Sequence, residues 1–189
     1  MRKFTEHAHA CWVVAVALSL FGLIATVGYV GAADPLPFQA RFAPGWSVEV
    51  LGGLSSAAQD QAGGVRQRAQ WKGLDGMAIL ELSCAWLSAD EHPDLVAQLT
   101  KISGGLADGY SKLGLAVQTS ASRTLSRGDR TWLAVDLRAS DGNGPRLAQT
   151  VAVTSSTRCF MTATLSGTPQ AFKAQASELE PVLDHLRLD

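Results

Sequence analysis

Cysteine and histidine are scarce in this sequence, and charge of one sign is nowhere concentrated. Only three cysteines and four histidines occur among 189 residues, which excludes a cysteine-rich disulfide scaffold. Without residues 1–33, the chain keeps 14 basic and 16 acidic side chains, a formal net charge of −2 over 156 residues. Nucleic-acid binding needs a concentrated basic face, so we expect no nucleic-acid partner.

The one long hydrophobic run lies at the N-terminus. Arg2 and Lys3 precede it, no charged residue occurs from Cys11 to Val30, and small residues follow at positions 31–33, as in a signal peptide with its cleavage site. Twenty uncharged residues in a helix span about 30 Å, so the run is also long enough to remain as an anchor. We predict residues 1–33 to be a signal peptide or an N-terminal membrane anchor. Because the positive charges precede the run, we expect an exported protein, periplasmic or anchored in the inner membrane with its domain outside.

Residues 45–189 are predicted to form a single domain, preceded by a linker. Residues 34–44 contain three prolines, which favour extended backbone. Beyond them, seven runs have strand-like patterns and are separated by polar or glycine-rich turns. Within the last four runs the turns are too short for a parallel crossover, so an antiparallel meander is expected there. The predicted strands cover residues 46–51, 65–72, 77–87, 115–125, 131–139, 146–155 and 158–166.

Two amphipathic helices complete the predicted domain. Ser88 opens a capping-box pattern, and apolar residues recur every three or four positions from Leu95 to Leu113. Thr168 and Pro169 mark the start of a second helix, in which Pro181 is expected to cause a kink or a restart. The fold class is therefore α+β: an antiparallel sheet of about seven strands packed by two amphipathic helices, in the order three strands, helix, four strands, helix.

Cys84 and Cys159 form a potential disulfide. They are the two cysteines that remain beyond the leader, and an even pair in an oxidising compartment favours a bond. Both also fall on the apolar side of predicted strands, where a free cysteine packs well as a small hydrophobic residue. The sequence leaves these two alternatives open.

No catalytic set stands out, and we expect neither a metal nor another cofactor. Side chains with metal-ligand chemistry gather at the start of the first helix: Asp90, Glu91, His92 and Asp94. Acidic residues at a helix start are explained equally well by the helix dipole. A serine/histidine hydrolase would depend on Ser55 or another serine with His92, but the residues around Ser55 lack the second glycine of a nucleophile elbow.

Three side chains are predicted to contribute to a binding surface. Arg66 and Arg68 share the basic face of one strand, and Trp132 shares its strand face with polar residues. Partial exposure of Trp132 and burial in the core are both open. The tripeptide Arg127-Gly128-Asp129 matches a sequence that adhesion receptors recognise, although glycine and aspartate are also typical of a hairpin turn.

The chain resembles a family of small, uncharacterised, exported proteobacterial proteins. The resemblance is carried by Pro44-Gly45-Trp46, by residues 64–87 (GVRQRAQWKGLDGMAILELSCAWL) and by residues 179–188 (LEPVLDHLRL). The same order of elements is similar to that of PsbP-like sandwiches, in which an antiparallel sheet lies between helices. The resemblance implies accessory or envelope proteins that are mostly non-enzymatic, and it defines no site residues in this chain.

Together these observations lead us to expect an exported envelope protein that acts as a non-enzymatic binding or accessory module. Its partner would be another envelope protein or a small apolar ligand held between sheet and helix. The alternatives are a small periplasmic serine/histidine hydrolase and a membrane-tethered assembly subunit.

Overall fold

The computed structural model describes residues 38–54, 64–74 and 76–188. The predicted leader, residues 1–33, lies outside these residues. Among the helices of the described part, none combines the length and the hydropathy needed to cross a bilayer. The elements are β1 (Phe38–Gln39), β2 (Ser47–Leu54), β3 (Gly64–Gly73), β4 (Gly76–Trp86), α2 (Leu95–Lys112), β5 (Ala116–Thr119), β6 (Arg123–Arg127), β7 (Arg130–Asp141), β8 (Gly144–Ser155), β9 (Cys159–Gly167), α3 (Pro169–Asp184) and β10 (Arg187–Leu188).

The main sheet has eight strands, all antiparallel, in the order β2-β3-β4-β9-β8-β7-β5, with β6 also paired to β7. The predicted α+β class and the meander that ends in β9 are confirmed. The predicted strand 115–125 is instead divided into β5 and β6, which pair with the two halves of β7. The division occurs at Ser120, whose hydroxyl accepts a hydrogen bond from the backbone N–H of Asp136 at 3.0 Å.

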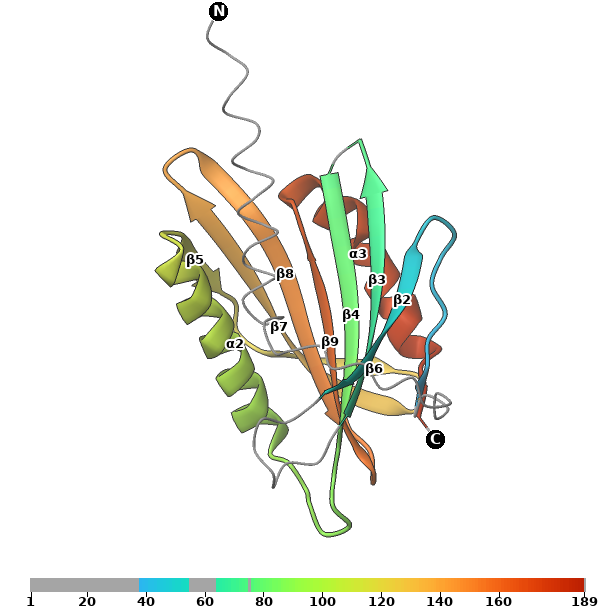
Figure 1. The fold of residues 1–189 in the computed structure, drawn as a ribbon. Helices are drawn as coiled ribbons and strands as arrows, with labels where there is room; N and C mark the ends of the chain where they lie inside the picture. The colour runs from blue at the N-terminus through green and yellow to red at the C-terminus, as the bar shows by residue number, and fades with distance from the viewer. Residues whose placement is uncertain (1–37, 55–63, 75, 189) are drawn as a thin grey trace, which may run out of the picture.

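The two helices cover opposite faces of the sheet (Figure 1). On one face α3 packs on β4, β9 and β8, and on the other α2 packs on β7, β8 and β5. Because both faces are covered, the central strands bury side chains in both directions. The core under α3 includes Leu80, Leu82, Met161 and Leu165, and the core under α2 includes Leu99, Val135, Val151 and Val153.

The folded domain begins earlier than the predicted boundary at residue 45. Phe38, which we assigned to the linker 34–44, is fully buried in the core under α3. Its strand β1 pairs with β10, and Phe38 lies opposite Leu188 in the register. Proline content alone suggested a linker, but the aromatic side chain between the prolines is a core residue and fixes this segment to the domain.

The predicted start of the second helix is confirmed, whereas the first helix begins later than the capping-box pattern indicated. The N-cap of α2 is Asp94, whose Oδ1 accepts the backbone N–H groups of Val96 at 2.9 Å and Ala97 at 3.1 Å. Ser88 and Glu91 do contact each other, but they close a separate turn ahead of the helix. Thr168 caps α3 as predicted, with Pro169 as the first helical residue. The helix continues through Pro181 to Asp184, so no restart occurs there.

Candidate functional site

One face of the sheet changes from aliphatic to polar between β8 and β9. Val151 and Val153 of β8 are fully buried on the side covered by α2. Their register partners on β9 are Thr164 and Thr162, which are only partly buried. Because α2 packs on the aliphatic half, no described helix covers the polar half of the same face, which lies beside α2.

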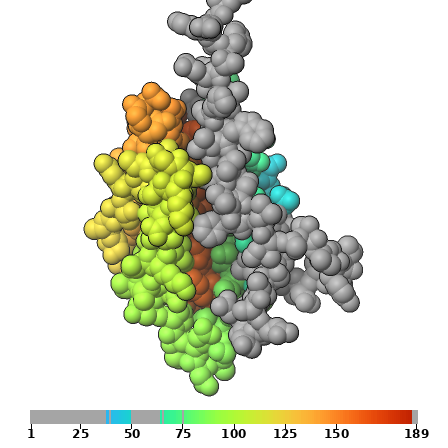
Figure 2. Space-filling model, turned by 60° about the vertical axis from the view of Figure 1, so that its left-hand side comes forward, coloured from blue at the N-terminus to red at the C-terminus, as the bar shows by residue number. Residues whose placement is uncertain are grey.

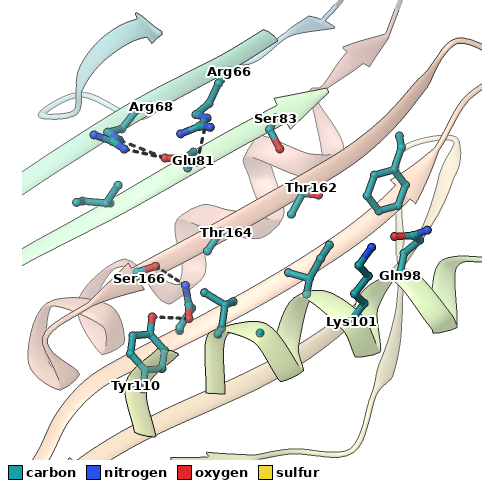
Figure 3. A pocket seen from close by; sticks show the side chains of 16 residues that line it. Arg66, Arg68, Glu81, Ser83, Gln98, Lys101, Tyr110, Thr162, Thr164 and Ser166 are labelled. Carbon is teal, nitrogen blue, oxygen red and sulfur yellow. Dashed lines mark hydrogen bonds and ion pairs between the residues drawn. The ribbon is translucent and has the colours of Figure 1, made fainter. Parts of the chain in front are cut away.

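The open half forms a groove of about 520 Å³, with α2 as one wall and β3, β4 and β9 as its floor (Figure 3). Figure 2 brings α2 forward, and a strip of the sheet is visible beside the helix. The helical wall runs from Gln98 to Tyr110, which corresponds to about 18 Å at 1.5 Å per residue. A volume of this size lies in the range of small-ligand sites.

Polar side chains stand in two parallel rows on the groove floor. In the first row Arg68, Glu81 and Thr164 are neighbours on adjacent strands, and in the second row Arg66, Ser83 and Thr162 are neighbours. Within the part of the chain that the structure describes, the hydroxyls of Ser83, Thr162 and Thr164 have no hydrogen-bond partner. They are therefore free to bond a ligand.

The charges of the groove do not balance. Glu81 pairs with both arginines, through Arg66 Nε to Oε1 at 3.4 Å and Arg68 Nη2 to Oε2 at 3.0 Å. Lys101 stands on the opposite, helical wall and makes no ion pair with any described residue. Among the described residues, three cations and one carboxylate line the groove, which leaves an excess of two positive charges in this part of the lining.

A buried polar chain closes one end of the groove. The Tyr110 hydroxyl donates to Gln149 Oε1 at 2.9 Å, and Gln149 Nε2 donates to the Ser166 hydroxyl oxygen at 3.0 Å. All three side chains are at most 5% exposed. Burial raises the pKa of Tyr110 to about 12, so this end of the groove stays neutral at ordinary pH.

The raised pKa of Tyr110 predicts a loss of stability at alkaline pH. Below pH 10 the phenol is protonated in both the folded and the unfolded chain, so its contribution is constant. Above pH 10 the unfolded chain loses the proton first, and the free energy of unfolding falls until the folded pKa of about 12 is reached. We expect wild type to lose about 1.4 kcal/mol more than Tyr110→Phe between pH 9 and pH 11 in urea unfolding. Parallel pH curves for the two proteins would contradict this assignment.

Of the predicted surface residues, Arg66 and Arg68 lie together in the groove, whereas Trp132 does not. Trp132 is 0% exposed and packs in the core under α3, so of the two alternatives left open burial is correct, and the assignment of Trp132 to a binding surface is wrong. The polar residues that follow on its strand face, Asp136 and Arg138, are less buried. One face of β7 therefore changes from core to surface along its length. The average polarity of the side chains on that face does not reveal this change.

Cys84 and Cys159 are joined by a disulfide in the structure. They lie on the neighbouring strands β4 and β9, their Cα atoms are 5.6 Å apart, and the bridge connects positions 75 residues apart in the sequence. Both side chains are buried in the core under α3. The disulfide thus lies on the opposite face of the sheet from the groove, where it joins β4 to β9 within the core.

The remaining sequence features do not meet in the groove. Glu91 and Asp94 serve as turn and helix caps, and the described residues contain no group of three or more acidic, histidine or cysteine side chains suited to a metal. His92 is exposed and does not line the groove, and Ser55 lies outside the described residues.

The tripeptide Arg127-Gly128-Asp129 forms the turn between β6 and β7 and packs on the end of α3. Arg127 forms an ion pair with Glu180, and the Gly128 N–H donates to Asp184 Oδ1 at 3.2 Å. A Cβ at position 128 would approach the Asp184 carbonyl oxygen to 3.0 Å, and the backbone φ there is +58°. These contacts explain the glycine by local structure.

Comparison with known proteins agrees with this architecture. The family model described as "Domain of unknown function (DUF4946)" matches residues 39–188. No curated protein sequence matches. Among solved structures, the solution structure of cyanobacterial PsbP (CyanoP) from Synechocystis sp. PCC 6803 is similar, with 12% identity and a TM-score of 0.51, over 88% of this chain and 99% of that one. At this identity the likeness shows the fold alone. The chain therefore belongs to the family described as Domain of unknown function (DUF4946), and its domain is a PsbP-like α+β sandwich.

Proposed function

We propose that this protein is an exported, non-enzymatic binding module of the cell envelope, and that its ligand occupies the groove beside α2. The observation that carries the proposal is the half-covered sheet face. Beside the aliphatic half that α2 covers, hydroxyl and charged side chains without full partners border a space of about 520 Å³. The proposal of export rests on the N-terminal run of residues 11–30 after Arg2 and Lys3.

The chemistry of the lining favours binding over hydrolysis. The described residues that line the groove include no histidine and no cysteine, and their single carboxylate, Glu81, is held by two arginines. A hydrolase needs a nucleophile within hydrogen-bond reach of a base that orients and deprotonates it. Among the described residues, no serine or threonine hydroxyl of the groove is hydrogen-bonded to a carboxylate or a lysine, so these hydroxyls are better suited to hold a ligand than to attack one.

Two adjacent glycines of α2 provide a matched test of the groove. Gly105 lines the groove and Gly104 does not, and a Cβ added to either one meets no atom within 4 Å. Phenylalanine is also a better helix former than glycine, so both substitutions should be tolerated. Gly105→Phe should fill the groove, and Gly104→Phe should leave it unchanged.

The measurement is photo-crosslinking in the native host envelope. A photoreactive amino acid at Gln98, which lines the groove, should form an adduct, whereas one at the exposed neighbour Ala97 should not. We expect Gly105→Phe to reduce the Gln98 adduct about tenfold, the effect of losing about 1.4 kcal/mol of binding free energy, and Gly104→Phe to leave it intact. Equal adducts at both positions, or a Gln98 adduct that survives Gly105→Phe, would show that the ligand binds elsewhere.

A further inference from the structure

We propose that the occupant of the groove is an extended acidic peptide segment of a partner protein. This inference rests on the proposed function and adds the chemical class of the ligand. It follows from three properties of the described lining: its charge, its length and the order of polar and apolar side chains along it.

The charge of the groove selects an anion. Arg66 and Arg68 share one carboxylate, so each guanidinium keeps N–H groups that Glu81 does not use. Lys101 faces them from the helical wall (Figure 3). A carboxylate placed between the floor and this wall would complete the charge balance and accept charge-assisted hydrogen bonds from both sides.

The length of the groove fits a short extended peptide. Along β9 the lining runs from Phe160 to Ser166, a separation of six residue steps or about 20 Å at the rise of a strand. An extended peptide of about six residues covers the same distance. Its backbone N–H and C=O groups need partners when they leave water, and the unpaired hydroxyls of Ser83, Thr162 and Thr164 on the floor can supply them.

The order of side chains distinguishes a peptide from a lipid chain. The middle of the floor is polar, and Phe160 stands at one end of it. Ile79 stands at the other end, beside the buried chain of Tyr110, Gln149 and Ser166, while Ile102 and Leu106 line the helical wall between the two ends. An acyl chain laid along the floor would cover Glu81 and the threonines without giving them hydrogen bonds, which is costly. A peptide with apolar residues at its ends and acidic residues between them matches this order.

The test uses the purified protein and three labelled six-residue peptides, each with leucine at both ends. The acidic probe carries two aspartates in the middle, and the control probes carry two asparagines or two lysines there. We expect the acidic probe to bind at least tenfold more tightly than either control in fluorescence anisotropy. Its affinity should fall about tenfold in Arg66→Gln/Arg68→Gln and in Gly105→Phe, and should be unchanged in Gly104→Phe. Circular dichroism of each variant establishes that it is folded.

Glu81 supplies a readout with the opposite sign. Because its carboxylate competes with an acidic ligand for both arginines, Glu81→Gln should tighten binding of the acidic probe several-fold. A residue needed only for structure would weaken binding when replaced. Equal affinity for all three peptides, no binding of any peptide, or weaker binding in Glu81→Gln would overturn the inference.

Two further probes separate this inference from the proposed function. Suppose that oleate or an acidic oligosaccharide binds, that Gly105→Phe abolishes this binding, and that the acidic peptide does not bind. The groove is then a binding site, and the assignment of a peptide as its ligand is wrong. If the photo-crosslinking at Gln98 also fails, then the proposed function is wrong together with the ligand class.

Discussion

Replacing both Cys84 and Cys159 by alanine is expected to lower the free energy of unfolding by about 4.5 kcal/mol. The bridge closes a loop between residues 75 apart in the sequence, and the loss of chain entropy in the unfolded state grows with the logarithm of loop length. Marginal stabilities of about 5 to 15 kcal/mol are usual, so the variant would lose much of its margin. Urea unfolding of the oxidised wild type and of the double variant measures the difference.

Alanine is the suitable replacement because both positions are buried in an apolar core. Serine would add a buried hydroxyl and confuse the loss of the bond with a desolvation cost. Reduced and unfolded wild type, refolded under reducing conditions, should show a stability close to that of the double variant. Free thiols at both Cys84 and Cys159 in the native, oxidised protein, or equal stabilities of wild type and variant, would remove the basis for this prediction.

Trp132→Ala is expected to cost about 3 to 5 kcal/mol, the usual range for truncating a large buried aromatic side chain. Trp132 is among the largest fully buried side chains and contributes to the core that joins β7 to α3. Its indole Nε1 is buried without a hydrogen-bond partner among the described residues. Trp132→Phe keeps much of the apolar area and removes the unpaired N–H, so its cost should be less than half as large.

Equilibrium unfolding of both Trp132 variants tests whether Trp132→Ala costs more stability than Trp132→Phe. Circular dichroism is the signal, because the substitution removes a fluorescent side chain. Binding of the acidic probe should be unaffected in the Phe variant, because Trp132 lies on the face of the sheet opposite the groove. A small cost for Trp132→Ala would mean that the indole is not part of the folded core. Weaker probe binding by a fully folded Trp132→Phe would mean that the indole contributes to the site.

Much of the fold could be predicted because it depends on short-range patterns. The two apolar faces of residues 77–87 indicated a central strand, and β4 lies between β3 and β9. The pairing of β4 with β9 could not be predicted from pattern, because those strands are separated by a helix and four strands. The resemblance to an uncharacterised family is confirmed by the matched family model, and the PsbP-like fold is confirmed by the likeness to cyanobacterial PsbP.

The groove was only partly accessible to sequence reasoning. The basic face with Arg66 and Arg68 was visible as an alternation, but Lys101 is brought to it by the sideways position of α2 on the sheet, which no local pattern encodes. The polar face of β9, by contrast, follows a local pattern. In β9, Thr162, Thr164 and Ser166 alternate with Met161, Ala163 and Leu165, which marks a strand with one buried and one polar face.

The pairing of β1 with β10 places the first and the last described strands side by side. Phe38 and Leu188 face each other across an antiparallel pair, so their backbones are only about 5 Å apart. A circularly permuted gene could begin in the exposed turn at Asn143 and join β10 to β1 through a short linker. Its product would contain all the same strand pairs. We therefore expect the described domain to tolerate circular permutation, because its strand pairs are the same whichever exposed turn the chain starts in.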